Sequence, residues 1–274
     1  MISIPAKSPY PKLFQIPPKY HYTAVDCPGH RDFIKNMIEG CATADVGLLL
    51  VPADGNFTTS IAKGDRNSGE IQGNTRQHAR LLNIMGVKQL IVGINKMDDP
   101  TAEWSEDRYN EIKNETTDML ISVGWYQHIK EGRVAFIPLS GWVGDNLITI
   151  SANMPWYKGW SVKVSPTETR TGVTLLEALD KIVPPARFPE KPLLFAVTNV
   201  YDSTSKLSIQ AGEGNVIVTG CVYQGKIQCN DIVGAICSGQ RGGKVMRIEN
   251  DKNEVNMASA GDNVGEWWWQ SKDI

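Results

Sequence analysis

Short apolar runs alternate with longer amphipathic stretches over the first part of the chain. The apolar runs have the length and the β-branched content of strands, and they lie at residues 21–26, 46–53, 88–96 and 133–140. The amphipathic stretches have helical spacing, and they lie at residues 33–44, 75–86, 105–124 and 174–183. Apolar strands separated by helices are typical of a parallel sheet covered on both faces, so we predict an α/β domain. Ser105 is the expected N-cap of the longest helix.

The pattern changes at residues 183–192, which hold four prolines. Such a segment is typical of a stiff linker and predicts a domain boundary. Short alternating strands punctuated by glycine follow it, which favours a small antiparallel β-barrel. We therefore predict an irregular, proline-rich arm at residues 1–19, the α/β domain at residues 20–185 and the barrel at residues 186–274.

Composition and charge narrow the function classes. The 274 residues include 28 lysines and arginines against 30 aspartates and glutamates, a formal charge of −2. No strong global field therefore pulls the chain onto nucleic acid or a membrane, and an RNA contact would need a local basic patch. No apolar run approaches the roughly 20 residues that span a bilayer, and the N-terminus lacks the apolar stretch of a secretory signal. We expect a cytoplasmic protein without a membrane partner.

The first chemical motif is Asp26-Cys27-Pro28-Gly29-His30, at the end of a predicted strand. An aspartate there can hold Mg²⁺ directly or through water, because this ion prefers oxygen ligands. The glycine lets a backbone N–H approach a terminal phosphate, and the histidine could position the attacking water. The alternative interpretations are a proline-glycine turn with an aspartate cap, or a metal hydrolase built on Asp26 and His30.

Two further motifs end the predicted strands at residues 88–96 and 133–140. In Asn95-Lys96-Met97-Asp98, the aspartate could accept both donors of the guanine edge, a pair that adenine cannot offer. Asn95 would organise the neighbouring loop, and the Lys96 stem would cover the face of the base. Backbone N–H groups of Ser140-Gly141-Trp142 could bind the guanine O6. Each motif alone could be a polar strand end, but their order and spacing together favour a guanine-nucleotide fold.

The chain resembles the translation elongation factor 1-alpha family. DCPGHRDFIKNMI, GVKQLIVGINKMD, SGWVGDNL and NMPWYKGW carry the likeness, and residues 51–82 are more similar to the elongation-factor-like branch. The resemblance implies a GTPase that uses GTP, GDP and Mg²⁺ and delivers aminoacyl-tRNA to the ribosomal A site, with a guanine-nucleotide exchange factor as a possible further partner.

The resemblance also implies roles for single residues. Asp26 would contact Mg²⁺ through water, the Gly29 amide would sense the γ-phosphate, and His30 would orient the hydrolytic water. The residues that recognise guanine would be Asn95, Lys96, Asp98 and Ser140. In the second domain, Glu249 falls where the family has an acidic residue near the terminal adenosine of tRNA, although a solvated strand-end carboxylate is an equal alternative.

The expected phosphate-binding loop, G-x-x-x-x-G-K-[ST], is not found. The glycine-lysine pairs at residues 225–226 and 243–244 are followed by isoleucine and valine, and both lie in the predicted barrel. We expect the first strand, the phosphate loop, the first switch and a third domain to be missing, so that the chain is a fragment. A degenerate binding module without catalysis, and a termination or rescue GTPase, are the alternative functions.

Overall fold

The computed structural model describes residues 22, 24–27, 37–38, 40–41, 44–65, 72–201, 215–234, 243–250 and 253–270. The chain divides into two compact units, Met1–Pro184 and Pro185–Ile274, and each is considered by itself. The predicted arm at residues 1–19 lies outside the described residues. In the described part of the chain, no helix combines the length and the apolar character needed to cross a membrane.

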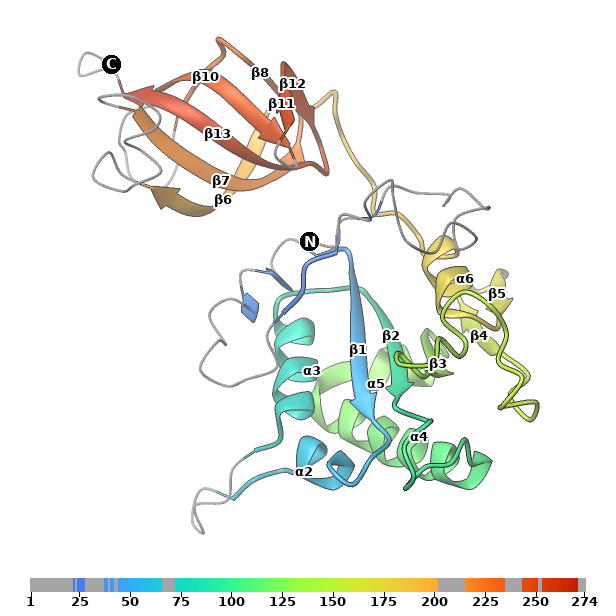
Figure 1. The fold of residues 1–274 in the computed structure, drawn as a ribbon. Coiled ribbons are helices and arrows are strands. Elements are labelled where there is room, and N and C mark those ends of the chain that lie inside the picture. The colour runs from blue at the N-terminus through green and yellow to red at the C-terminus, as the bar shows by residue number, and fades with distance from the viewer. Residues whose placement is uncertain are drawn as a thin grey trace. The chain divides into compact units, whose positions relative to one another are not determined.

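A three-stranded parallel sheet in the order β1-β2-β3 forms the centre of the first unit (Figure 1). Its strands are Val46–Pro52 (β1), Gln89–Asn95 (β2) and Val134–Pro138 (β3), which confirms three of the four predicted strands. The helices and the two short antiparallel strands are Phe57–Ile61 (α2), Asn74–Ile84 (α3), Glu106–Leu120 (α4), Ile121–Trp125 (η2, a π-helical turn), Tyr126–Lys130 (α5), Trp160–Lys163 (β4), Thr169–Gly172 (β5) and Leu175–Asp180 (α6).

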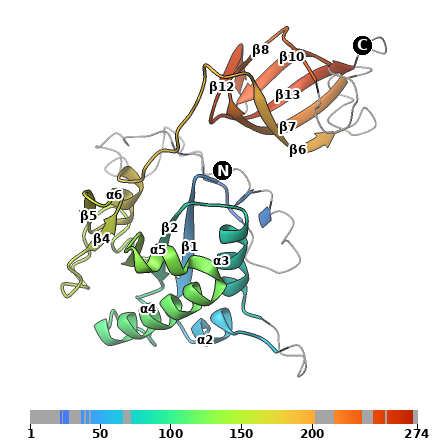
Figure 2. The same cartoon turned by 180° about the vertical axis from the view of Figure 1, so that it is seen from behind.

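The two faces of the sheet are covered to different extents. Helices α2 to α4 pack on one face, where Leu49 joins the larger core, and Figure 2 shows α3, α4 and α5 in front of the strands. On the other face Ile137 packs with Trp160 and α6. Leu48 and Leu50 of β1 point to that second face and are 41% and 50% exposed. In the described part of the chain, the prediction of a sheet covered on both faces is therefore wrong for β1, because the described elements on that face cover β2 and β3 and leave these two side chains of β1 exposed, and side chains alternate along a strand.

The predicted strand at residues 21–26 is also wrong for its described part. Tyr22 and residues 24–27 belong to no strand, and the side chain of Val25 is 46% exposed. The side chains of Val25 and Cys27 pack closely against the backbone of Gly40. A Cβ added to Gly40 would lie only 2.8 Å from Cys27 Sγ and 3.0 Å from Val25 Cγ1. An alternating pattern predicts a strand only where a backbone partner is available, and in the described residues β1 pairs with β2 alone.

Helix α4 begins as the sequence predicts. The Ser105 side chain accepts a hydrogen bond from the Arg108 N–H at 3.3 Å, which confirms the N-cap. The helix ends in the π-helical turn, where Gly124 adopts a φ of 108°. A Cβ at this position would lie 2.1 Å from Asn83 Nδ2, the end of a side chain that can move, so it is the left-handed backbone conformation that requires glycine.

The second unit is built from antiparallel strands, as predicted. Its main sheet has the order β11-β10-β13-β7-β6 and curves around a core that includes Val222, Ile227, Val245 and Ile248 (Figure 1). The strands are Leu194–Tyr201 (β6), Asn215–Gln224 (β7), Lys226–Gln228 (β8), Ile232–Val233 (β9), Gly243–Asn250 (β10), Asn253–Val255 (β11), Met257–Ser259 (β12) and Asn263–Gln270 (β13).

Candidate functional site

The carboxyl ends of the three parallel strands meet at one edge of the sheet. Pro52 of β1 is paired with Asn95 of β2, and Ile94 of β2 is paired with Pro138 of β3. The loops that follow the strands therefore begin side by side. Ligands of open α/β sheets bind beyond these ends of the strands. The structure thus brings the second and third predicted motifs together.

The side chain of Asn95 joins the loops after β2 and β3. Its Oδ1 accepts hydrogen bonds from the Lys96 N–H and the Gly141 N–H, each at 2.8 Å. A second link runs from the Met97 N–H to the Leu139 carbonyl oxygen at 3.1 Å. One amide oxygen therefore fixes the two loops as a single unit.

Lys96 is held by an aspartate of the first loop. Its backbone has a φ of 65°, in the left-handed region, and its Nζ lies 2.6 Å from Asp54 Oδ2. Burial alone would raise the pKa of Asp54, but hydrogen bonds from Lys96 and Asn56 outweigh it and lower this pKa. The same hydrogen bond raises the pKa of Lys96. Sequence reasoning missed Asp54; the available signal was an Asp-Gly pair directly after a predicted strand, at the same sheet edge as Lys96.

Asp98 carries an unused acceptor. Its Oδ1 is buried and has no hydrogen-bond partner among the described residues. The neighbouring Asp99 differs, because its Oδ1 accepts from the hydroxyl and the N–H of Thr101 at 2.7 and 2.9 Å, and these bonds lower the pKa of Asp99. A buried polar atom without a partner costs about 1–3 kcal/mol. A ligand that donates to Asp98 would remove this cost.

The loop after β3 is shaped by a buried serine. Ser140 has no exposed surface, and its Oγ accepts from the Val143 N–H at 3.0 Å. Its own N–H donates to the Asp145 carbonyl oxygen at 3.2 Å. Trp142 lies at the tip of this turn, and its side chain is 92% exposed. Ser140 therefore fixes the turn, and Gly141 and Trp142 present their backbone near β2.

A buried carboxylate that sequence reasoning missed anchors both loops. Asp145 Oδ2 accepts from Trp104 Nε1 at 2.8 Å, and Asp145 Oδ1 accepts from Ser151 Oγ at 2.7 Å. The backbone N–H of Trp104 in turn donates to the backbone carbonyl oxygen of Met97, the residue before Asp98, at 2.8 Å. These contacts join segments that are far apart in the sequence, so the motif pattern alone carried no signal for them.

The first motif is only partly described. Asp26 is exposed and Cys27 is half-buried, and burial raises the pKa of the Cys27 thiol. Pro28, Gly29 and His30 lie outside the described residues. Among the residues that the structure does describe, no three histidine, cysteine, aspartate or glutamate side chains form a group that could hold a metal ion.

Glu249 lies in β10 of the second unit. Its Oε1 is 2.8 Å from Arg247 Nη2, and Arg247 Nε is 3.2 Å from Glu254 Oε2 on β11. Glu249 therefore belongs to a cluster of ion pairs on the sheet surface.

Comparison with known proteins gives consistent matches. The family model of the elongation factor Tu GTP binding domain matches residues 3–185. Elongation factor 1-alpha of Mucor circinelloides f. lusitanicus is 40% identical over 249 residues, and that of Hypocrea jecorina is 42% identical over 249 residues. Both alignments cover 90% of this chain and 49% of the relative, so the chain spans about half the length of the curated relatives it matches.

Solved structures show a similar fold. Translation elongation factor SelB from Methanococcus maripaludis, in complex with the GTP analogue GppNHp, is similar with a TM-score of 0.55. The identity is 18%, and the match covers 91% of this chain and 46% of that chain. The apo form of the same protein gives a TM-score of 0.53 at 20% identity, over 91% of this chain and 42% of that chain. At these identities the likeness concerns the fold alone.

Proposed function

This chain belongs to the family of the elongation factor Tu GTP-binding domain, and we propose that its first unit binds the base of GTP and GDP where β2 and β3 end. The match to elongation factor 1-alpha relatives confirms the family resemblance that the motifs indicated.

The free acceptor on Asp98 carries this proposal. Guanine presents an N1–H and an N2 amino group on one edge, and a single carboxylate can accept from both. Adenine offers no such pair of donors. The Asp98 carboxylate supplies acceptors, and its buried Oδ1 has no competing partner among the described residues. The empty acceptor and the guanine edge are therefore complementary.

The surrounding residues complete the base site. The Lys96 stem covers one face of the base, and the ion pair with Asp54 keeps this side chain in place. Asn95 holds the loop after β3 against the loop after β2. The Gly141 N–H already donates to Asn95 Oδ1 and fixes the turn that Ser140 shapes. The backbone N–H of Trp142, the next residue, is the donor for the guanine O6.

The phosphate side of the site rests on the family resemblance. We assign Mg²⁺ binding through water to Asp26, the contact with the γ-phosphate to the Gly29 N–H, and orientation of the hydrolytic water to His30, with Cys27 and Pro28 completing the loop. Mg²⁺ bound there would offset charge on the phosphates. Nucleotide affinity depends on this side as well, because charge-assisted hydrogen bonds are worth about 1.5–3 kcal/mol each.

The complete protein is proposed to be a translational GTPase. Family membership and the relatives named elongation factor 1-alpha favour GTP hydrolysis coupled to delivery of aminoacyl-tRNA to the ribosomal A site in the cytoplasm. Its partners would be aminoacyl-tRNA, the ribosome and a guanine-nucleotide exchange factor. Glu249 would lie near the aminoacylated end of the tRNA.

Binding of fluorescent GDP and GTP in the presence of Mg²⁺ tests the base site. The experiment compares the chain itself with a chimera that carries the N-terminal segment of one elongation factor 1-alpha relative. In whichever form binds, Asp98→Asn should weaken binding at least about tenfold, because a charge-assisted acceptor is lost. Asp99→Asn is the matched control and should have little effect, since Thr101 already occupies that carboxylate.

A change of base specificity separates recognition from misfolding. Xanthine has a carbonyl group at C2 in place of the amino group, so the donor of an asparagine side chain can pair with it. Asp98→Asn should therefore gain affinity for xanthosine diphosphate while it loses affinity for GDP. Equal binding of GDP by the parent and the Asp98→Asn variant, or no binding by either form of the protein, would rule out the guanine assignment.

A further inference from the structure

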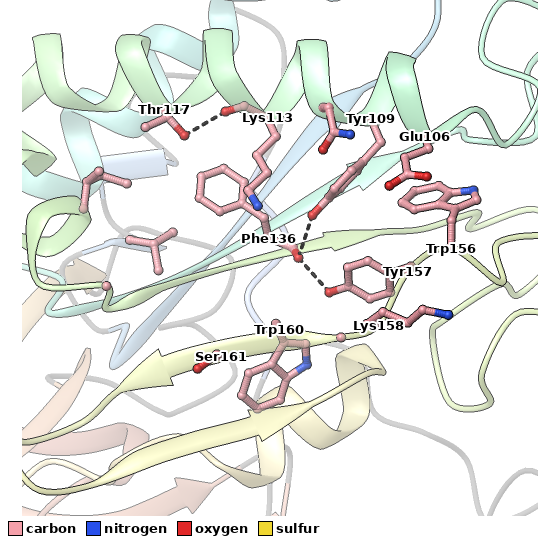
Figure 3. Close-up of a pocket in the computed structure, with 15 residues that line it drawn as sticks. Glu106, Tyr109, Lys113, Thr117, Phe136, Trp156, Tyr157, Lys158, Trp160 and Ser161 are labelled. Carbon is pink, nitrogen blue, oxygen red and sulfur yellow. Dashed lines mark hydrogen bonds between the residues drawn. The ribbon is translucent and has the colours of Figure 1, made fainter.

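A cavity of about 380 Å³ lies in the first unit, and none of the residues of the base site lines it. It lies between α4 on one side and residues 156–161 on the other (Figure 3). Pockets for small molecules begin at about 300 Å³, so the cavity has room for a compact ligand.

Aromatic rings in fixed positions form much of the wall. The ring centroids of Tyr109 and Trp156 are 5.3 Å apart, and those of Tyr109 and Tyr157 are 5.8 Å apart. Both tyrosine hydroxyls donate to the Phe136 carbonyl oxygen, at 3.1 and 2.8 Å (Figure 3). The Trp156 and Trp160 indole N–H groups donate to carbonyls outside the cavity, at 2.8 and 3.2 Å. The wall therefore offers ring surface whose polar atoms are already satisfied.

One cation sits within this aromatic wall. Lys113 Nζ is 5.8 Å from the centroid of the Tyr109 ring and 5.9 Å from that of Phe136. Among the described residues its ammonium has these rings as partners and no carboxylate. An ammonium has three donors, and ring faces use none of them as a full hydrogen bond. The resident charge repels a second cation from the aromatic wall, and its open donors attract an anion.

The other charges near the cavity do not cancel this preference. Lys158 adds a second positive charge, and its Nζ donates to the Pro155 carbonyl oxygen at 2.8 Å. Glu106 lies in the first turn of α4, seven residues before Lys113, which is about 10 Å along the helix axis. Burial raises the pKa of Tyr109 and of Tyr157, so neither phenol becomes an anion that could occupy the Lys113 donors.

We propose that this cavity binds a small aromatic carboxylate. The ring of the ligand packs against Trp156 and Tyr157, which are half-buried on the same side as Lys113, and its carboxylate accepts hydrogen bonds from the Lys113 ammonium. A neutral aromatic ligand gains only the packing, and an aromatic cation is opposed by Lys113. The ligand class follows from the half-buried rings of Trp156 and Tyr157 beside an ammonium that has no carboxylate partner among the described residues.

Phenylacetate, phenylacetamide and phenethylamine provide a matched series of anion, neutral molecule and cation. The titration follows the indole N–H signal of Trp156 by NMR in the full chain, with the signal assigned from a Trp156→Phe variant; the indole of Trp160, which packs on the other face of the sheet, should not shift. A ligand of this size should bind with a dissociation constant on the order of 1 mM. Phenylacetate should bind about fivefold more tightly than phenylacetamide, the range of a partly exposed ion pair, and phenethylamine should bind most weakly.

Variants at two lysines test the cause of the preference. Lys113→Gln should remove the difference between acid and amide, and Lys113→Arg should keep it. Lys130→Gln is the matched control, since Lys130 Nζ also lies over a ring, 5.7 Å from the centroid of Tyr126, but does not line the cavity. Equal affinity for acid and amide, an unchanged preference in Lys113→Gln, a loss of equal size in Lys130→Gln, or no saturable shift of the Trp156 indole signal would each overturn the proposal.

Discussion

Replacing Asn95 by alanine should loosen both loops of the base site at once. The Asn95 Oδ1 accepts from the Lys96 N–H and the Gly141 N–H at 2.8 Å, and both bonds are lost in the variant. A net hydrogen bond contributes about 1 kcal/mol, and the freed N–H groups are near solvent, so the expected loss of unfolding free energy is about 1–2 kcal/mol. Urea denaturation measures this loss as a lower midpoint at an unchanged slope.

Amide hydrogen exchange gives the local form of the same prediction. The Lys96 and Gly141 amides should exchange about tenfold faster in Asn95→Ala, because each loses about 1.4 kcal/mol of protection. Asn95→Asp keeps an oxygen in the same place and should retain most of the protection and stability. If the aspartate variant is as unstable as the alanine variant, the oxygen is not the group that joins the loops and the argument fails.

Three further substitutions test the first unit. Glu177→Ala removes the capping box of α6 and should lower the free energy of unfolding by about 1 kcal/mol at neutral pH. Backbone hydrogen bonds lower the pKa of Glu177 in the folded state, so this contribution is lost as the pH falls below about 4. The urea denaturation curves of parent and variant should then converge. Trp125→Phe should cost about 2–3 kcal/mol by calorimetry, because the indole is fully buried and donates to a carbonyl of α3 at 2.8 Å. Gly159→Ala should cost more than about 1 kcal/mol, since its φ is 110° and a Cβ would lie 2.4 Å from the Gly172 oxygen, whereas Gly55→Ala, which meets nothing within 4 Å, should be close to neutral in the same melting assay.

Local patterns were sufficient for the parts of the fold that depend on neighbouring residues. The apolar run at residues 88–96 predicts β2, where the central residues are all buried. Ser105 predicts the start of α4 because an N-cap acts within one turn. The rule that parallel strands end at one edge also predicts that residues 95–98 and 140–142 meet.

Other features depend on contacts that the sequence does not display. An apolar run has the same composition whether one or both faces are covered, so the exposure of Leu48 and Leu50 could not be predicted. The ion pair of Lys96 with Asp54 spans 42 positions in the sequence, and the bond from Trp104 to Asp145 spans 41. Both contacts follow from the assembled sheet edge, which places these side chains together only after the strands have paired.

The unused acceptor of Asp98 also affects how the protein behaves without a ligand. A buried oxygen without a donor lowers the stability of the ligand-free protein, and a bound base that donates to it returns that free energy. Specificity and heat resistance are therefore linked at one atom. The ligand-free chain should be the form most easily unfolded or cleaved by protease, and protection by a guanine nucleotide should increase with its free concentration.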